Sequence, residues 1–248
     1  MSKVDLRVDW CSYEAAKYAV MHWHYSKSMP VGKMVKLGVW EAENFRGSVV
    51  FACGSSGVGS IGKSMGLLSF EVAELARVAL QEHWHPVTRI LSIALKMLRR
   101  SQPGLRLVVS YADPEQNHIG AIYQAGNWVY TGRSAKDTAY IDRTGKRWHS
   151  RSVSESGIKV HCGKPTKCPR PSEMVRQIDV PRKYRYFMPL DRAMRRQIEP
   201  LAQPYPKRAG EAKTANAPGV QPGNRGFESH PSALETEQPP QPPPTGDG

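Results

Sequence analysis

The chain is 248 residues long, 40% of them hydrophobic and 23% charged, and its formal net charge is +13. This length supports one substantial core with extensions, and the lack of a long apolar run excludes a membrane-spanning helix. The first residues lack the apolar stretch of a secretory signal peptide, so we expect a cytoplasmic protein whose cysteines are reduced thiols or ligands. The basic excess predicts a polyanionic partner, with nucleic acid favoured over a membrane surface.

The N-terminal part predicts a helix followed by a β-hairpin. Small apolar residues lie on one side of the predicted helix, and Ser12 is suited to cap its start. Two apolar stretches then flank a short polar turn, which is the pattern of a hairpin. In chain order, we expect a helix at 11–22, a loop at 23–33, strands at 34–42 and 46–54 with a turn at Glu43-Asn44, and a Gly- and Ser-rich loop at 54–69.

The middle of the chain predicts alternating strands and helices. The most distinctive helix has Pro86 near its first turn and Arg99-Arg100 at its C-terminal end, where cations suit the helix dipole. The predicted elements are a strand at 70–80, this helix at 86–100, a buried strand at 105–113, a short helix at 120–126, a strand at 128–134, a hairpin over 138–152 with its turn at Thr144-Gly145, and an extended segment at 184–190 among one or two short helices within 172–199.

This order predicts the α/β (α+β) class, with a mixed central sheet covered on both faces and a strand–helix–strand crossover at its centre. We expect a catalytic domain at 1–170 and a basic extension at 171–208 that packs on it and contacts DNA. Residues 209–248 are rich in Pro and Gly and poor in apolar residues, so we expect them to form a disordered tail.

Groups capable of acid–base chemistry gather after the strand at 105–113. Asp113 follows an apolar run at the carboxyl end of a buried strand, where α/β folds often place reactive groups. It either caps the turn before Pro114 or acts as a general base or an oxygen ligand. Tyr123 is either a buried aromatic with a satisfied hydroxyl, or a general acid or oxyanion donor. His118 lies between them in the sequence.

Aromatic residues around His24 suit a site that stacks a base. Loop histidines are usually just exposed, but Trp23 and Tyr25 flank this one. An amine inside a duplex is reached only by flipping the base or in a single strand, and a flipped adenine needs aromatic faces. Trp84 and Trp128 are further stacking candidates, although most tryptophans at such places belong to the core.

Two groups of residues offer metal ligands by type. His83 and His85 share one side of an extended stretch, which suits a metal or a phosphate as well as a solvated loop. His161, Cys162 and Cys168 supply one imidazole and two thiolates. Their spacing is wider than is usual in structural zinc sites, which disfavours zinc here.

Two stretches interleave cations with aromatic residues, at 143–152 and 181–187. A solvated charged face usually mixes signs, whereas these stretches are nearly all positive. The pattern suits contact with a phosphate backbone and stacked bases. The candidate DNA-binding residues are Arg147, Trp148, Arg151, Arg182, Lys183 and Arg185.

The element order resembles the GNAT acyltransferase fold. In that family the helix after the fourth strand covers the pyrophosphate of acyl-CoA, and the segment 123–128, "YQAGNW", is close to the family's Y-x-x-x-G-[FW] element. The chain departs from the family at 81–89, which has no Gly where the family has its Gly-rich phosphate loop, so acetyl-CoA is a doubtful donor. Backbone N–H groups at the helix start can still hold an anion. The candidate donor-binding residues are His85, Thr88, Arg89, Ser110 and Gln124.

A narrower resemblance runs from roughly residue 20 to 208. The stretches "WHYSKSMPVGKMVKLGVW", "ELARVAL…HPVTRI", "SYADPEQNHIGAIYQAGNW" and "YRYFMPLDRAMRR…YPKR" resemble the phage Mom family of DNA-modification proteins. The resemblance implies conversion of adenine in phage DNA to N6-(carbamoylmethyl)adenine, which protects that DNA from host restriction enzymes. It also implies iron as a candidate cofactor and leaves the group donor open. The implied catalytic residues are His24, Tyr25, Asp113 and Tyr123, and the candidate metal ligands are His24, Asp113 and His118.

The sequence therefore favours a transferase that acts on a flipped adenine in DNA. One alternative is a conventional acyl-CoA-dependent N-acetyltransferase, which the lack of glycines at 81–89 disfavours. The other is a non-catalytic DNA-binding protein, which leaves the density of polar groups over 110–124 unexplained.

Overall fold

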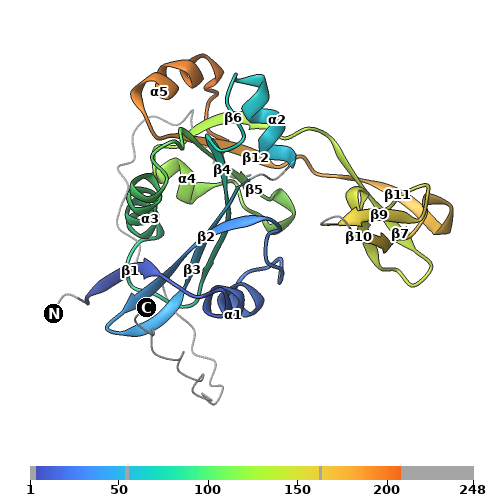
Figure 1. Ribbon diagram of the computed structural model, residues 1–248, viewed down its shortest axis with the longest axis horizontal. Helices are drawn as coiled ribbons and strands as arrows, with labels where there is room; N and C mark the ends of the chain where they lie inside the picture. The colour runs from blue at the N-terminus through green and yellow to red at the C-terminus, as the bar shows by residue number, and fades with distance from the viewer. Residues whose placement is uncertain (1–3, 54–55, 162–163, 208–248) are drawn as a thin grey trace, which may run out of the picture. The chain divides into compact units, whose positions relative to one another are not determined.

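The computed structural model describes residues 4–53, 56–161 and 164–207. Its centre is a seven-stranded sheet in the order β1-β2-β3-β4-β5-β12-β6 (Figure 1). Only the pair of β4 and β5 runs parallel among the described strands, so the predicted mixed α/β class is confirmed. The strands are β1 (Leu6–Trp10), β2 (Lys33–Glu41), β3 (Asn44–Cys53), β4 (Val72–Leu80), β5 (Leu107–Ala112), β6 (Val129–Arg133) and β12 (Tyr184–Pro189).

Helix α3 (Val87–Ser101) makes the crossover between the parallel strands β4 and β5. Parallel neighbours cannot be joined by a tight turn, so the chain must cross the sheet between them. The buried residues Ile90, Leu91, Ala94 and Leu98 recur at helical spacing and pack on the sheet. This confirms the predicted strand–helix–strand crossover at the centre of the sheet.

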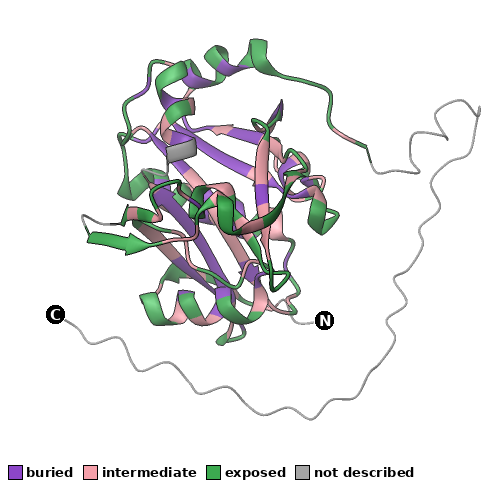
Figure 2. Ribbon diagram, turned by 90° about the vertical axis from the view of Figure 1, so that its right-hand side faces the viewer, coloured by how far each residue is buried: buried purple, intermediate pink, exposed green. Residues whose placement is uncertain are grey.

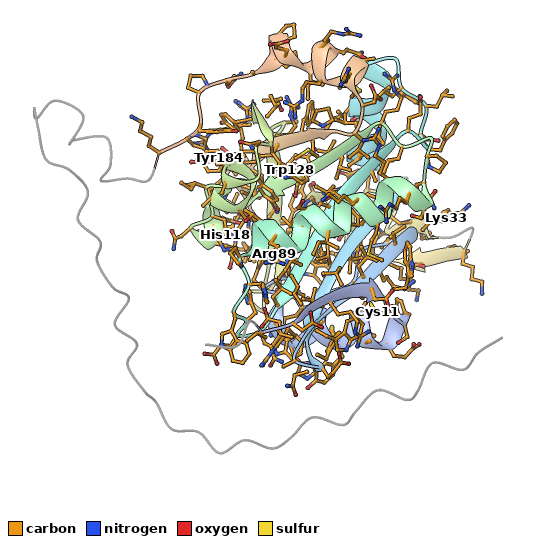
Figure 3. All side chains as sticks on the ribbon, turned by 90° about the vertical axis from the view of Figure 1, so that its left-hand side faces the viewer. Cys11, Lys33, Arg89, His118, Trp128 and Tyr184 are labelled. Atoms are coloured by element: carbon orange, nitrogen blue, oxygen red, sulfur yellow. The ribbon has the colours of Figure 1, made fainter. Side chains whose placement is uncertain are left out.

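Helices cover both faces of the sheet, as expected. Successive residues of β3 point to opposite faces of the sheet. Val49 packs in the cluster under α3, and Val50 packs in a cluster with α1. The central strands are largely buried as a result (Figure 2), and Figure 3 looks onto the face that α3 covers. One face carries α3 and α4 (Ala121–Ala125), and the other carries α1 (Tyr13–Trp23), α2 (Ser56–Ser64) and α5 (Arg192–Ile198).

Two local expectations are wrong. The segment expected to be a loop at 54–69 contains helix α2. Its glycines suggested a loop, but a Cβ on Gly62 would come within 3.0 Å of Val72, so the missing side chain lets the helix pack closely on β4. The turn between β2 and β3 falls at Ala42-Glu43 instead of Glu43-Asn44, with φ of 47° and 62°.

Beyond β6 the chain builds a smaller sheet in the order β11-β7-β8. The predicted hairpin over 138–152 is confirmed as β7 and β8. The segment expected to form a basic extension contributes β11 to this sheet and β12 to the central one, between β5 and β6. The remaining elements are β7 (Asp137–Asp142), β8 (Arg147–His149), β9 (Ile158–His161), β10 (Lys164–Lys167), β11 (Met174–Val180) and four 3-10 turns at Pro114–Gln116, Ser150–Ser152, Pro171–Glu173 and Glu199–Leu201.

Strands β1, β9, β10 and β11 were not expected from the sequence. They are short or largely exposed, so little apolar alternation marks them. The tail expected at 209–248 lies outside the described residues. Among the helices that the structure describes, none is both long and apolar enough to cross a membrane.

Candidate active site

The strands β4 and β5 separate at the centre of the sheet. They pair only from Val72–Leu107 to Glu74–Val109, and the paired ladder then ends. Ser110 lies just past this point, with its Oγ 3.0 Å from the carbonyl oxygen of Leu75 on β4 and 2.8 Å from Tyr123 Oη. A side chain of β5, a backbone carbonyl of β4 and a side chain of α4 therefore meet where the ladder ends.

The two residues expected to perform the chemistry lie on opposite sides of β5. Val108 belongs to the cluster under α3, and Val109 belongs to the cluster on the other face. Because residues alternate along a strand, Ser110 points to the α3 side with Tyr123. Asp113 continues in an extended conformation, with φ −94° and ψ 113°, and points to the opposite side.

Asp113 is paired with Lys183. Its Oδ2 lies 2.8 Å from Lys183 Nζ, and the side chain of Asp113 is 8% exposed while that of Lys183 is 40% exposed. The other oxygen, Oδ1, accepts the backbone N–H of Glu115 at 3.0 Å and so caps the turn that follows. Antiparallel pairing of Tyr184 with Ala112 brings Lys183 to this place. The sequence pattern predicts only DNA contact for Lys183 and does not reveal its ion pair with Asp113.

Three rings stand beside this pair. The Tyr25 ring stacks on His24 with centroids 4.3 Å apart and meets His118 edge-on at 5.8 Å. His24 Nδ1 accepts the backbone N–H of Ser26 at 3.1 Å, so the neutral ring carries its proton on Nε2. Burial, followed by the nearby basic groups Arg77, His118, Lys183 and Lys27, lowers the pKa of His24 to about 4. His24 is therefore a neutral hydrogen-bond donor through Nε2.

Tyr25 lies within electrostatic reach of the charged pair and still meets solvent. Burial raises its pKa, Lys183 lowers it and Asp113 raises it, so the phenol lies within electrostatic reach of both. The residue is nevertheless 45% exposed. An exposed aromatic face next to a carboxylate suits a stacked base whose amine faces the carboxylate.

Tyr123 is buried on the other side of β5. Its ring packs on Trp128 and Tyr186, each with a centroid distance of 5.1 Å, and burial raises its pKa to about 12. Ser110 has one hydroxyl proton; when that proton goes to the carbonyl of Leu75, Ser110 accepts the proton of Tyr123. Tyr123 is thus a protonated phenol with a satisfied hydroxyl.

Arg77 and Glu74, on β4, were not singled out from the sequence. Arg77 Nε donates to the carbonyl of Ser28 at 2.9 Å, which ties the loop after His24 to β4. The charges of Glu74 and Tyr25 also act on the Arg77 guanidinium. The sequence could have indicated them as site residues, because both are charged residues inside the otherwise apolar strand "VAELARVAL".

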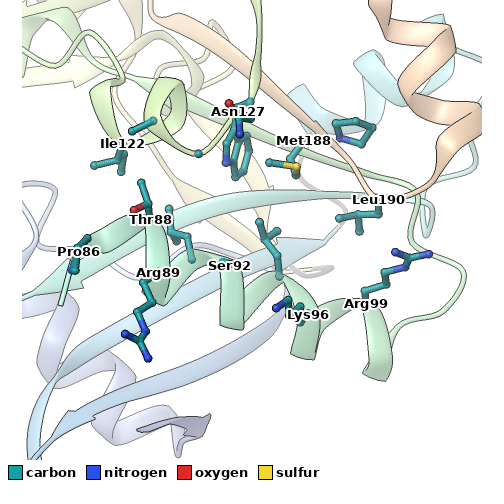
Figure 4. Close-up of a pocket in the computed structure, with 16 residues that line it drawn as sticks. Pro86, Thr88, Arg89, Ser92, Lys96, Arg99, Ile122, Asn127, Met188 and Leu190 are labelled. Carbon is teal, nitrogen blue, oxygen red and sulfur yellow. The ribbon is translucent and has the colours of Figure 1, made fainter. Parts of the chain in front are cut away.

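The candidate donor-binding residues do not form one site in the described structure. Thr88 and Arg89 line a groove of about 540 Å³ between α3 and α4, together with Lys96 and Arg99 (Figure 4). Ser110 instead binds Tyr123. The two others are engaged elsewhere: Gln124 Nε2 donates to Tyr186 Oη at 3.1 Å, and His85 binds Glu41.

The arrangement does not fit the iron that the resemblance implies. Within residues 4–53, 56–161 and 164–207, no three His, Cys, Asp or Glu side chains gather as a metal site. Nδ1 of His24 is engaged by Ser26, and Asp113 is engaged by Lys183. We therefore derive no step through a metal. Cys162, a candidate zinc ligand, lies outside the described residues.

Several candidate DNA-binding residues border the face that carries Asp113. Arg147 makes two bonds to the Glu115 carboxylate, at 3.0 and 3.1 Å. Burial and Glu74 raise the pKa of Tyr111, and the cations Arg185 and Arg151 lower it, so both arginines lie near this β5 residue.

The other candidates hold the small sheet and β6 in place. Trp148 Nε1 donates to Asp142 at 2.7 Å beneath Lys146, whose Nζ lies 3.9 Å from the ring centroid. Arg182 Nε donates to the carbonyl of Ser134 at 2.6 Å. Arg182 thus serves the fold while remaining at the surface.

Comparison with known proteins identifies the family. A model of the Mom protein family matches residues 5–207. The chain is 24% identical over 210 residues to the methylcarbamoylase mom of Escherichia phage Mu, which covers 82% of this chain and 84% of that protein. Similar solved structures include a Bacillus subtilis acetyltransferase in complex with CoA (TM-score 0.40, 12% identity, 76% of this chain and 100% of that one). Another is the ribosomal-protein-S5-alanine acetyltransferase of Vibrio fischeri (TM-score 0.43, 10% identity, 77% and 98%). Because the family match spans most of its length, the chain belongs to the Mom protein family.

Proposed function

We propose that this protein is a transferase that converts adenine in phage DNA to N6-(carbamoylmethyl)adenine and thereby protects the DNA from host restriction enzymes. Membership of the Mom family and similarity to a protein named methylcarbamoylase support the reaction class. The observation that carries the proposal is the Asp113–Lys183 pair beside the exposed ring of Tyr25. This combination suits an amine presented on a flipped base.

On the acceptor side, the flipped adenine stacks on Tyr25 with its N6 amine toward Asp113. Arg151 borders the same face and suits a backbone phosphate next to the base, whereas the Arg185 guanidinium is held by Thr131 of β6. His24, neutral with its proton on Nε2, donates to a ring nitrogen of the adenine. Lys183 holds the Asp113 carboxylate in a fixed orientation until the base arrives.

In the transfer step, N6 attacks the methylene carbon of the carbamoylmethyl donor. The N6–carbon bond forms, the bond from that carbon to the leaving group breaks, and Asp113 takes the proton that N6 loses. Tyr123, protonated at neutral pH, lies on the opposite side of β5 and supplies a proton to the leaving group.

The test is nucleoside analysis of plasmid DNA from cells that express the protein. Wild-type protein should yield the carbamoylmethyl-modified adenosine by mass spectrometry, and Asp113→Asn should yield none while still binding duplex DNA. Glu115→Gln is the matched control, because it alters a neighbouring carboxylate that pairs with Arg147. Unmodified adenine with folded wild-type protein would overturn the proposed function. Wild-type modification by Asp113→Asn would overturn the role of Asp113.

A further inference from the structure

Strands β9 and β10 form a two-stranded ribbon of their own, separate from the two larger sheets (Figure 1). The outer face of this ribbon carries Val160 opposite Pro165 and Ile158 opposite Lys167. Ile158 is 52% exposed and Val160 is 73% exposed, and neither joins a buried cluster among the described residues. An isolated two-stranded ribbon is only marginally stable in water, so its exposed apolar face suits a partner.

The ribbon is tethered near the candidate active site. Lys159, on its inner face, donates from Nζ to the backbone carbonyl of Arg151. Arg151 lies near Tyr111 of β5, the strand that leads into Asp113. Because successive side chains of a strand point to opposite sides, the bond of Lys159 turns the outer face away from Arg151. The outer face is therefore open to a partner that also reaches Asp113.

The ribbon and the residues just after it carry positive charge alone. Residues 158–170 contain three lysines and Arg170 but no Asp or Glu. Lys164 and Lys167 are exposed, and within the described residues neither forms an ion pair with a carboxylate. Unpaired cations attract a polyanion and displace its counterions on binding. Charge therefore favours nucleic acid over a second copy of this chain, whose ribbon would carry the same sign.

The major groove of B-DNA admits a two-stranded β-ribbon, whereas the minor groove is only about half as wide. Each A·T pair presents the thymine methyl group there, and apolar side chains contact it. We propose that the β9–β10 ribbon lies in the major groove next to the adenine that is modified, with its outer face against thymine methyl groups and with Lys164 and Lys167 at backbone phosphates. The inference rests on the proposed function, because it assigns how that DNA is held.

The first experiment changes the DNA and leaves the protein intact. Wild-type protein is titrated onto a fluorescein-labelled duplex rich in A·T pairs and onto the same duplex with deoxyuridine in place of thymidine, and fluorescence anisotropy reports binding. We expect at least about threefold weaker binding to the uracil duplex, since burial of a methyl group contributes at this level. Netropsin, a minor-groove ligand, should not displace the protein. Equal affinity for the two duplexes, or displacement by netropsin, would overturn the inference.

The second experiment changes the outer face. Val160→Ser should bind the thymine and uracil duplexes nearly equally, because the protein side of the methyl contact is gone. Val175→Ser is the matched control, since Val175 is also an exposed strand valine, at 63%, but lies on β11. The control should keep the wild-type preference for thymine. An undiminished preference in Val160→Ser would count against the inference.

The third experiment measures the salt dependence of binding to the thymine duplex. Lys164→Ala/Lys167→Ala should reduce the slope of log affinity against log salt by about 2, since each phosphate contact contributes about 1. Arg195→Ala/Arg196→Ala removes the same charge from exposed positions of α5 and should leave the slope unchanged. Equal slopes in the two double variants would exclude phosphate contact by the ribbon.

Two further outcomes separate this inference from its alternatives. Wild-type protein that modifies adenine in the nucleoside assay but shows no preference for thymine would sink this inference alone, whereas a preference for thymine without modified adenine would sink the proposed function alone. Sedimentation without DNA tests a second copy as the occupant. A dimer that Val160→Ser loses and Val175→Ser keeps would assign the outer face to that copy and overturn the inference.

Discussion

The buried imidazole of His24 makes the stability of this protein depend on pH in a way that one substitution removes. His24 is 9% exposed, and four basic side chains act on it. Its pKa falls from the ordinary 6.5 to about 4, so the folded protein keeps the ring neutral where the unfolded chain would protonate it. Between these two values the unfolded state binds more protons, and stability therefore falls as the pH falls.

The size of the effect follows from the two pKa values. Well above pH 6.5 neither state binds the proton, and His24 contributes no pH dependence. At about pH 4.5 the unfolded state is almost fully protonated at this site, whereas the folded state is mostly neutral, which costs about 2–3 kcal/mol relative to pH 7.5. This is a large part of the stability of an ordinary domain.

The assay is urea unfolding of wild type and His24→Gln at about pH 7.5 and pH 4.5. Glutamine cannot titrate, so the variant should lose about 2–3 kcal/mol less stability over this interval than wild type does. All other titrating groups are common to both proteins and cancel in the comparison. Ser26→Ala keeps the imidazole but removes a hydroxyl 2.8 Å from Nδ1, and it should retain most of the wild-type pH dependence. Equal losses in wild type and His24→Gln would refute the reasoning.

Three further outcomes follow from single contacts. Lys183→Met should lower adenine modification at least about tenfold, because about 1.4 kcal/mol of lost positioning at Asp113 is enough, while Lys183→Arg should retain most of it in the nucleoside assay. Ser12→Ala should cost about 1 kcal/mol in urea unfolding, since the hydroxyl accepts the third N–H of its helix at 3.1 Å. Gly120→Ala should cost more than about 2 kcal/mol by the same measurement, because φ is +83° and an added Cβ would overlap the buried ring of Tyr186.

The local elements were predictable where the sequence is periodic. Helix α3 shows a wide apolar stripe with Arg99 and Arg100 in its last turn, and β5 is a mostly apolar run that contains Ser110, so both were found nearly to their ends. Helix α2 was missed because its glycines favour loops locally. Its stability comes from packing against β4, which a local pattern does not reveal.

The long-range contacts of the site were not predictable from the sequence. Lys183 reaches Asp113 only because β12 returns from far along the chain to lie beside β5, and no local signal specifies that partner strand. Glu41 likewise looked like an ordinary charge at a strand end. It becomes buried only when the segment at Trp84 and His85 folds over it. The sequence shows that Lys183, Asp113 and Glu41 are charged, but it does not predict which residues they contact.

The division of the site by β5 constrains the proposed reaction more than any single residue does. Asp113 belongs to the face bordered by Tyr25 and Lys183, and Tyr123 belongs to the face covered by α3 and α4. A proton taken by Asp113 and a proton given by Tyr123 therefore leave and enter on different sides of the strand. The transferred carbon must then lie where β4 and β5 cease to pair, close to Ser110, with the adenine on one side and the leaving group on the other.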